Sequence, residues 1–170
     1  MRRTFCAGFV LLLLASCSYP VLRSDLLEKG TRDVSMVQMA QNPSLYEGKL
    51  FILGGSIVST SLTETGSVVE AIHIPVDSKG YLRETEPATG RFLAFYVREL
   101  GILDPVVYQP GRRVTLAAEL VEMRPGRIGE MDYTFPYFNV RQLYLWEEGQ
   151  PRSYFPNTFF SIGIGVGGRW

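Results

Sequence analysis

The residue with the most distinctive chemistry is Cys17, at the end of Leu14-Ala15-Ser16-Cys17. A thiol can act as a nucleophile, and small residues beside it leave room for a peptidase to reach the peptide bond. Upstream, a positively charged start precedes an apolar run over 5–15. This is the layout of a secretory signal, and the run is too short to span a bilayer. We therefore expect residues 1–16 to form a signal peptide.

The sequence around Cys17 resembles the lipobox of bacterial lipoproteins. In such proteins the thiol receives a diacylglycerol, the chain is cut before the cysteine, and the new amine is acylated. The resemblance implies a membrane anchor at Cys17, followed by a lipidated tether over 17–32. Lipoproteins that are retained in the inner membrane resemble one another in carrying an aspartate directly after the cysteine. Here that position is Ser18, so we expect the protein to reach the outer membrane. The alternative is an ordinary signal with an incidental cysteine near its cleavage site.

Apart from the motif at Cys17, no set of residues indicates a chemical role, and none indicates catalysis. His73 is the only histidine and Cys6 lies in the signal, so a metal or nucleophilic site lacks partners, and we interpret His73 as a barrel or surface residue. The pattern Gly163-x-Gly165-x-x-Gly168 fits a dinucleotide fingerprint by spacing alone, because no βαβ unit surrounds it. Nothing pairs two carboxylates across a cleft, as glycosidases require. The carboxylates considered, which we interpret as solvated turn charges, are Glu64, Glu70, Asp77, Glu84, Glu86, Asp104, Glu130 and Asp132. We predict no catalytic residue, cofactor or metal.

Aromatic residues make up 12% of the chain and gather in the later part of the sequence. We interpret these aromatic residues first as part of the barrel core. The alternative is a stacking surface for sugars, which OB-like barrels can offer, with Tyr133, Tyr137 and Phe138 as its residues.

Composition limits the remaining function classes. The chain has 170 residues, with 17 lysines and arginines against 17 aspartates and glutamates. Removal of residues 1–16 takes away Arg2 and Arg3, leaving 154 residues with 15 basic and 17 acidic side chains, a net charge of −2. That length suits one domain with its own core. Nucleic-acid binding is not expected, because it needs a concentrated basic surface.

The apolar pattern predicts a mainly β domain over 33–150. A short helix over 33–41, capped by Asp33 or Ser35, comes first, and Gly54-Gly55 marks a bulge or bend in a long strand. The strands are expected over 50–62, 68–76, 91–98, 112–123 and 133–146, with a polar loop over 77–90, a connection over 101–111 and a turn-rich loop over 124–132. These elements favour a small five-stranded antiparallel OB-like barrel, with an open sandwich as the alternative.

Several short motifs occur together in a recognisable order. They are Asn42-Pro43-Ser44-Leu45-Tyr46-Glu47-Gly48-Lys49, Gly54-Gly55, Gly90-Arg91-Phe92, Leu103-Asp104-Pro105, Pro110-Gly111-Arg112, Ile128-Gly129-Glu130 and Leu143-Tyr144-Leu145-Trp146. With Cys17, they make residues 17–148 resemble the Slp family of starvation-inducible outer-membrane lipoproteins of Gram-negative bacteria. The resemblance implies a location and an envelope role, and supplies no catalytic residues. The aromatic and glycine-rich tail over 151–170 lies beyond it, and we expect that tail to touch the membrane.

We therefore expect a non-enzymatic lipoprotein in the periplasmic leaflet of the outer membrane, held there by lipid at Cys17. It would contribute to envelope integrity or to the stress or starvation response. The alternative is a module that binds an envelope oligosaccharide or lipid. The sequence does not identify a protein partner.

Overall fold

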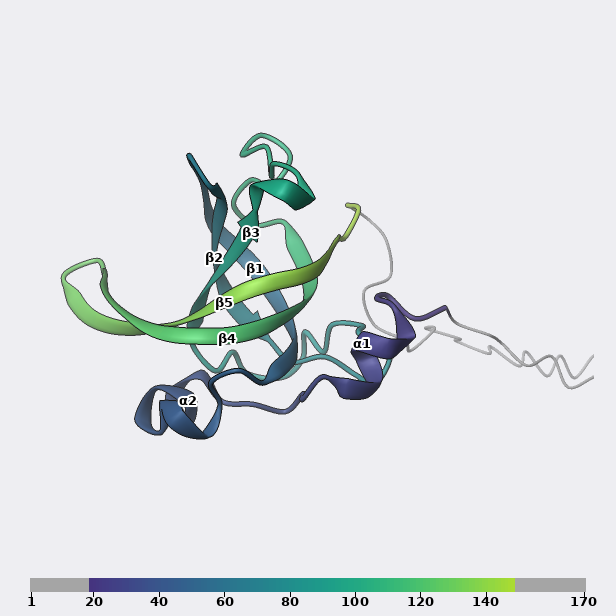
Figure 1. The fold of residues 1–170 in the computed structure, drawn as a ribbon, viewed down its shortest axis with the longest axis horizontal. Helices are drawn as coiled ribbons and strands as arrows, with labels where there is room; N and C mark the ends of the chain where they lie inside the picture. Colours follow the sequence, from purple (N-terminus) through teal and green to yellow (C-terminus); the bar gives the residue numbers. More distant parts are fainter. Residues whose placement is uncertain (1–18, 149–170) are drawn as a thin grey trace, which may run out of the picture.

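The structure, a computed structural model, describes residues 19–148, and these form a β-barrel preceded by two short helices (Figure 1). The predicted signal peptide, Cys17 and the 151–170 tail lie outside the described residues. The helices are α1 (Ser24–Lys29) and α2 (Met36–Gln41), with 3₁₀ turns η1 (Pro43–Leu45) and η2 (Arg98–Leu100). The strands are β1 (Leu50–Thr63), β2 (Gly66–Ile74), β3 (Arg91–Val97), β4 (Arg113–Ile128) and β5 (Met131–Leu145).

The strands form a closed barrel in the order β1-β2-β3-β5-β4. Closure confirms the predicted five-stranded barrel and excludes the open sandwich. The prediction of an antiparallel barrel is wrong at one pair, because β3 and β5 run parallel from Leu93↔Tyr137 to Phe95↔Asn139. The reason is parity: strand directions cannot alternate all the way around a ring of five, so one neighbouring pair must be parallel.

Alternating apolar residues fill the barrel. On β4, the predicted inward set of Val114, Leu116, Ala118 and Leu120 is buried in the barrel core. At its centre lie three fully buried phenylalanines, with Phe138 meeting Phe51 and Phe92 edge-on at ring centroid distances of 5.9 and 5.8 Å. Edge-on contact suits the aromatic quadrupole. The residues of the aromatic centre are Phe51, Phe92 and Phe138.

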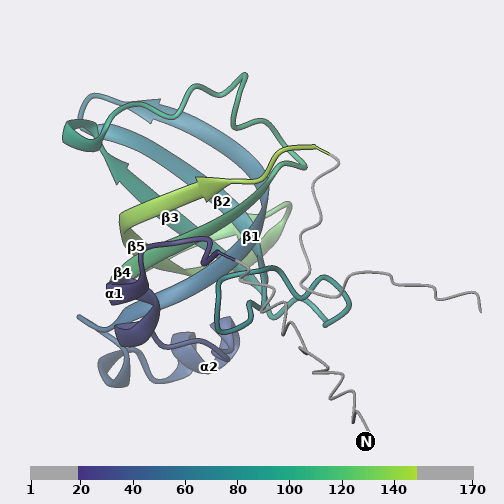
Figure 2. The same cartoon turned by 90° about the vertical axis from the view of Figure 1, so that its right-hand side faces the viewer.

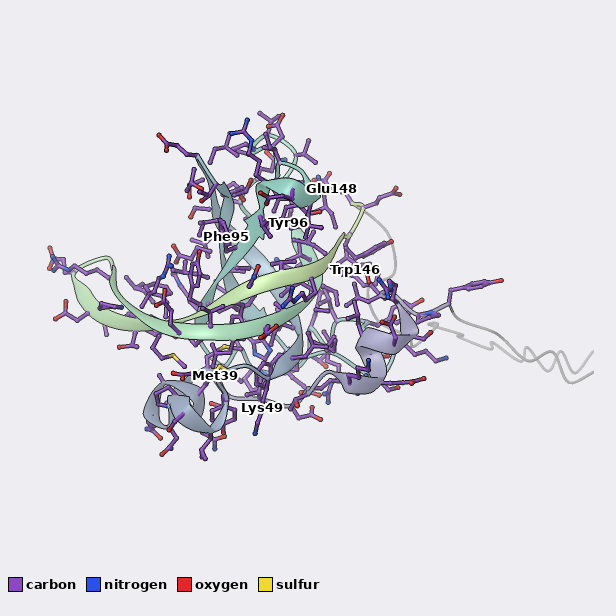
Figure 3. All side chains as sticks on the ribbon, viewed as in Figure 1. Met39, Lys49, Phe95, Tyr96, Trp146 and Glu148 are labelled. Atoms are coloured by element: carbon purple, nitrogen blue, oxygen red, sulfur yellow. The ribbon has the colours of Figure 1, made fainter. Side chains whose placement is uncertain are left out.

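The helix α2 closes one end of the barrel. Its cap is Ser35, one of the two predicted, whose side chain accepts a hydrogen bond from the Gln38 N–H. Met36 and Met39 are buried and join the barrel core, and Met39 lies between α2 and the barrel in Figure 3. The helix ends at Gln41 before Asn42-Pro43, as expected where the residue before proline is driven out of the helical region.

Gly54 and Gly55 do not form the predicted bulge. Both continue the ladders to β2 and to β4 without a shift, and neither has a positive φ. The irregularity lies further along β1, between Ile57 and Ser59. The glycines serve close packing instead: a Cβ on Gly54 would lie 2.4 Å from Leu82 Cδ2. The loop that carries Leu82 therefore rests directly on the backbone of β1.

The predicted loop over 124–132 is also wrong. β4 and β5 pair without interruption from Arg124↔Phe135 to Ile128↔Met131, and they project from the barrel as a two-stranded ribbon (Figure 1). Pro125 fits because β4 pairs with β1 only as far as Glu119, so the ribbon has a free edge. The remaining strand limits agree closely with the prediction.

Candidate functional site

The chain is attached to the barrel from its first described residues. The Tyr81 hydroxyl donates to the Tyr19 carbonyl at 3.2 Å, and the Val21 N–H donates to the Lys79 carbonyl at 2.9 Å. Cys17 is two positions before Tyr19. Ser18 alone separates the predicted lipidation site from the first residue that is hydrogen-bonded to the barrel.

Of the segment predicted as a lipidated tether over 17–32, the described residues 19–32 include α1 and pack on the barrel wall, so for them a flexible spacer is wrong. Figure 2 shows α1 lying across the strands on the side that faces the viewer. Leu22 and Leu27 are buried, and a Cβ on Gly30 would lie 2.5 Å from the Ile52 side chain. The segment thus belongs to a second hydrophobic cluster outside the barrel, which we call the outer cluster. Its buried residues are Leu22, Leu27, Ile52, Val76, Leu82, Ala117 and Trp146. Within residues 19–148, no helix has the length and apolarity needed to cross a membrane.

The end of β5 belongs to the same outer cluster. Trp146 Nε1 donates to Thr115 Oγ1 at 3.0 Å, and the Thr115 hydroxyl donates to the Gly80 carbonyl at 2.9 Å. The Trp146 ring also contacts Tyr81, with centroids 5.5 Å apart, and Figure 3 shows Trp146 on the side of the barrel that carries α1. Both ends of the described chain therefore leave the barrel on one side.

A surface pocket of about 430 Å³ opens beside α1, between that helix and the loop after β2. We call it the α1 pocket, and it is lined by Pro20, Ser24, Leu27, Glu28, Arg32, Ser78 and Lys79. Sequence reasoning missed it, because Arg32 and Lys79 come from distant segments and match no motif.

The predicted aromatic surface of Tyr133, Tyr137 and Phe138 is not formed. Phe138 is fully buried in the barrel core, so it cannot face a ligand. Tyr137 points the other way, since adjacent residues of a strand face opposite sides. It is 6% exposed, stacks on Phe95 with centroids 6.2 Å apart, and is covered by the Arg124 guanidinium at 3.3 Å. Burial raises the pKa of the Tyr137 phenol, which Arg124 partly offsets.

Tyr133 lies at a groove of about 240 Å³ between α2 and the ribbon. Its hydroxyl accepts a hydrogen bond from the Arg91 N–H at 2.9 Å. Its ring meets Phe135 edge-on, with centroids 4.6 Å apart. The phenol therefore fixes the start of β3 against β5, and its polar group is already used by the fold.

His73 is buried, so of the two positions expected for it, barrel or surface, the barrel is correct. Its Nδ1 hydrogen-bonds to Thr89 Oγ1 at 2.6 Å, beside a pocket of about 250 Å³ whose other residues include Asp33 and Glu86. Burial lowers the pKa of the imidazole from 6.5 to about 4. The side chain is therefore neutral near pH 7 and holds the loop of Thr89 to β2.

The burial of His73 predicts a specific loss of stability in acid. Between pH 6.5 and about 4, His73 is protonated in the unfolded chain but stays neutral in the folded chain. The free energy of unfolding should therefore fall as pH falls through this window, by on the order of 3 kcal/mol in total. Chemical denaturation across this range should show a shallower fall for His73→Gln, whose amide cannot titrate. Parallel curves for the two proteins would contradict the assignment.

Three of the carboxylates that were considered for catalysis, Glu70, Glu84 and Asp77, have other roles. Glu70 pairs with Arg91 at 2.7 Å, and Glu84 pairs with Arg113 at 2.9 Å. Asp77 Oδ1 accepts hydrogen bonds from the backbone of its own loop. Across residues 19–148 no group of three or more His, Cys, Asp or Glu side chains is arranged to hold a metal ion.

Comparison with known proteins connects the barrel and the N-terminal sequence to one family. The family model described as "Outer membrane lipoprotein Slp family" matches residues 14–166. "Outer membrane protein Slp" of Escherichia coli K12 is 28% identical over 160 residues, covering 93% of this chain and 80% of that protein. An uncharacterized protein of Haemophilus influenzae is 27% identical over 95 residues, covering 55% of this chain and 50% of its own length.

Among solved structures, a mitochondrial single-stranded DNA binding protein from S. cerevisiae is similar, with a TM-score of 0.35 and 11% sequence identity. The match covers 61% of this chain and 99% of that one.

Proposed function

Because this chain belongs to the outer membrane lipoprotein Slp family, we propose that it is a lipid-anchored, non-enzymatic barrel domain. It sits at the periplasmic leaflet of the outer membrane of a Gram-negative bacterium and contributes to envelope integrity under stress or starvation.

One observation carries this proposal: the chain is hydrogen-bonded to the barrel from Tyr19, two residues after Cys17. A lipoprotein with a long spacer can act far from its membrane. Here the domain is held at the lipid surface, which supports a role in the membrane layer itself. Acylation of both the thiol and the new amine would give several chains, enough for stable anchoring.

The chemistry of the described residues supports a non-enzymatic role. The carboxylates named above are engaged with arginines or with loop backbone, and His73 is held by Thr89. The family model that matches the chain indicates no catalytic family.

Expression of the full chain in a Gram-negative host tests the anchor. Mass spectrometry of the protein from the outer-membrane fraction should show a mature chain that begins at an acylated Cys17. Cys17→Ala should abolish acylation and remove the protein from that fraction. Cys6→Ala is the matched control, because this second cysteine lies within the predicted signal. An unmodified chain that still starts at Met1 would contradict the proposal.

The same variants test the envelope role. In a strain that lacks the protein, the unaltered chain and Cys6→Ala should restore resistance to detergent during starvation, and Cys17→Ala should not. Equal rescue by Cys17→Ala would separate the envelope role from the anchor.

A further inference from the structure

The predicted lipid anchor would bring the α1 pocket within reach of the membrane. Pro20 lines the pocket and is three positions after Cys17. Three peptide units span at most about 11 Å. The headgroup layer of a bilayer is roughly 5–7 Å deep on each side of the hydrocarbon core. Lipid headgroups are therefore the nearest ligands for this pocket.

The lining of the pocket suits an anion. It holds two cations, Arg32 and Lys79, against one carboxylate, Glu28. The hydroxyls of Ser24 and Ser78 supply further donors at the same opening. Arginine offers a planar fork of N–H groups that matches the oxygens of a phosphate, and hydroxyls complete such sites. The chemistry of the lining therefore favours a phosphate over an apolar ligand.

Arg32, which lines this pocket, keeps part of its guanidinium unpaired. One end of its guanidinium donates to the Leu27 carbonyl, while its Nε is buried and has no hydrogen-bond partner among residues 19–148. A buried donor without a partner costs about 1–3 kcal/mol, so folded proteins rarely leave one unpaired. The Arg32 side chain would therefore gain from a small shift that brings this N–H group to an acceptor in the pocket.

The opposite wall of the pocket is formed before any ligand arrives. The Lys79 and Tyr81 N–H groups both donate to Asp77 Oδ1, at 2.8 and 2.9 Å, which fixes the loop that carries Ser78. Gly80 has a φ of +89°, and a Cβ there would lie 3.2 Å from Val21. The loop is thus held against the N-terminal segment, and little ordering remains to be done on binding.

We propose that the α1 pocket binds the phosphate of a phospholipid headgroup in the leaflet that holds the anchor. This inference rests on the proposed anchoring at Cys17. Arg32 donates to the phosphate oxygens, Lys79 supplies a second positive charge, and the serine hydroxyls donate at the rim. The anchor raises the effective concentration of headgroups at the pocket, so a modest intrinsic affinity is sufficient. Binding there fixes which side of the barrel faces the membrane.

The test uses the mature chain, residues 17–170, with Cys17→Ser, so that the result does not depend on acylation. This protein should sediment with vesicles of phosphatidylethanolamine and phosphatidylglycerol, and should not sediment with vesicles of a galactolipid, which lacks phosphate. Arg32→Ala should weaken binding about tenfold or more, as loss of a charge-assisted hydrogen bond implies. Arg127→Ala is the matched control: it removes the same charge from the exposed ribbon and should leave binding unchanged.

Ser78→Glu keeps the proposal testable if Arg32→Ala does not fold. Ser78 is exposed on its loop, and a carboxylate there should repel phosphate without disturbing the core. Vesicle binding that survives both substitutions would overturn the proposal, as would equal binding to galactolipid vesicles. Displacement by inorganic phosphate at the concentration of the lipid phosphate would show a free-phosphate site and would also overturn it. Absence of acylation at Cys17 in cells would contradict the proposed anchor but would not change the result of this vesicle experiment, so the two failures can be told apart.

Discussion

Gly54→Val should destabilise the domain by about 3 kcal/mol or more, among the larger costs of inserting bulk into a packed site. A Cβ at this position would lie 2.4 Å from Leu82 Cδ2 and 2.5 Å from the Ile74 carbonyl oxygen. The carbonyl belongs to the neighbouring strand and cannot move without breaking the ladder to β1. The measurement is the free energy of unfolding by chemical denaturation.

Two further substitutions on β1 separate packing from β-propensity. Gly55→Val should cost less than Gly54→Val, since its Cβ would meet Ala71 Cβ at 3.0 Å and Phe92 Cζ at 3.2 Å. Ser59→Val places the same side chain at an exposed position of the strand and should be close to neutral. Equal melting temperatures for Gly54→Val and Ser59→Val would refute the close approach of Leu82 to the β1 backbone.

Phe138→Ala should be comparably severe, with a cost of about 3–5 kcal/mol. It empties the centre of the barrel core, where Phe138 touches both Phe51 and Phe92. Against a typical stability of about 5–15 kcal/mol, such a loss removes a large share of the folding free energy. Denaturation monitored by circular dichroism should show a lower midpoint with little change in slope.

Tyr137→Ala is the matched control for Phe138→Ala. It removes an aromatic ring from the adjacent position, but one that packs outside the barrel between Phe95 and Arg124. We expect it to cost clearly less than Phe138→Ala. An equal cost for the two would mean that the barrel interior is not where Phe138 contributes its stability.

Local signals predicted the barrel well. The alternation of Val114, Leu116, Ala118 and Leu120 identified the inner face of β4, and one of the two expected caps, Ser35, precedes α2. These signals depend only on residues a few positions apart, which periodicity and capping detect. The parallel pair β3–β5 was not predicted, although a closed ring of five strands requires at least one such pair.

The missed features depend on distant residues. Leu22 and Leu27 are buried only because Ala117 and Trp146 cover the same side of the barrel, and no local pattern shows that. Pro125-Gly126 is typical of a turn, yet the free edge of the ribbon accepts it within a strand.

The candidate site likewise has one part that a local motif predicts and one part that depends on distant residues. Cys17 follows from a local motif and stays a prediction. The α1 pocket joins Arg32 to Lys79 across the fold, and sequence spacing gave no sign of it.

The attachment of the chain to the barrel from Tyr19 has a consequence for encounters at the membrane. With lipid at Cys17, the short stretch of chain before Tyr19 keeps the domain close to its anchor and limits how far it can turn. The ribbon, on the far side of the barrel from α1 in Figure 1, then keeps to a restricted range of directions. A partner that approaches that side meets a domain already oriented, so their association sacrifices less rotational entropy than binding to a freely turning protein.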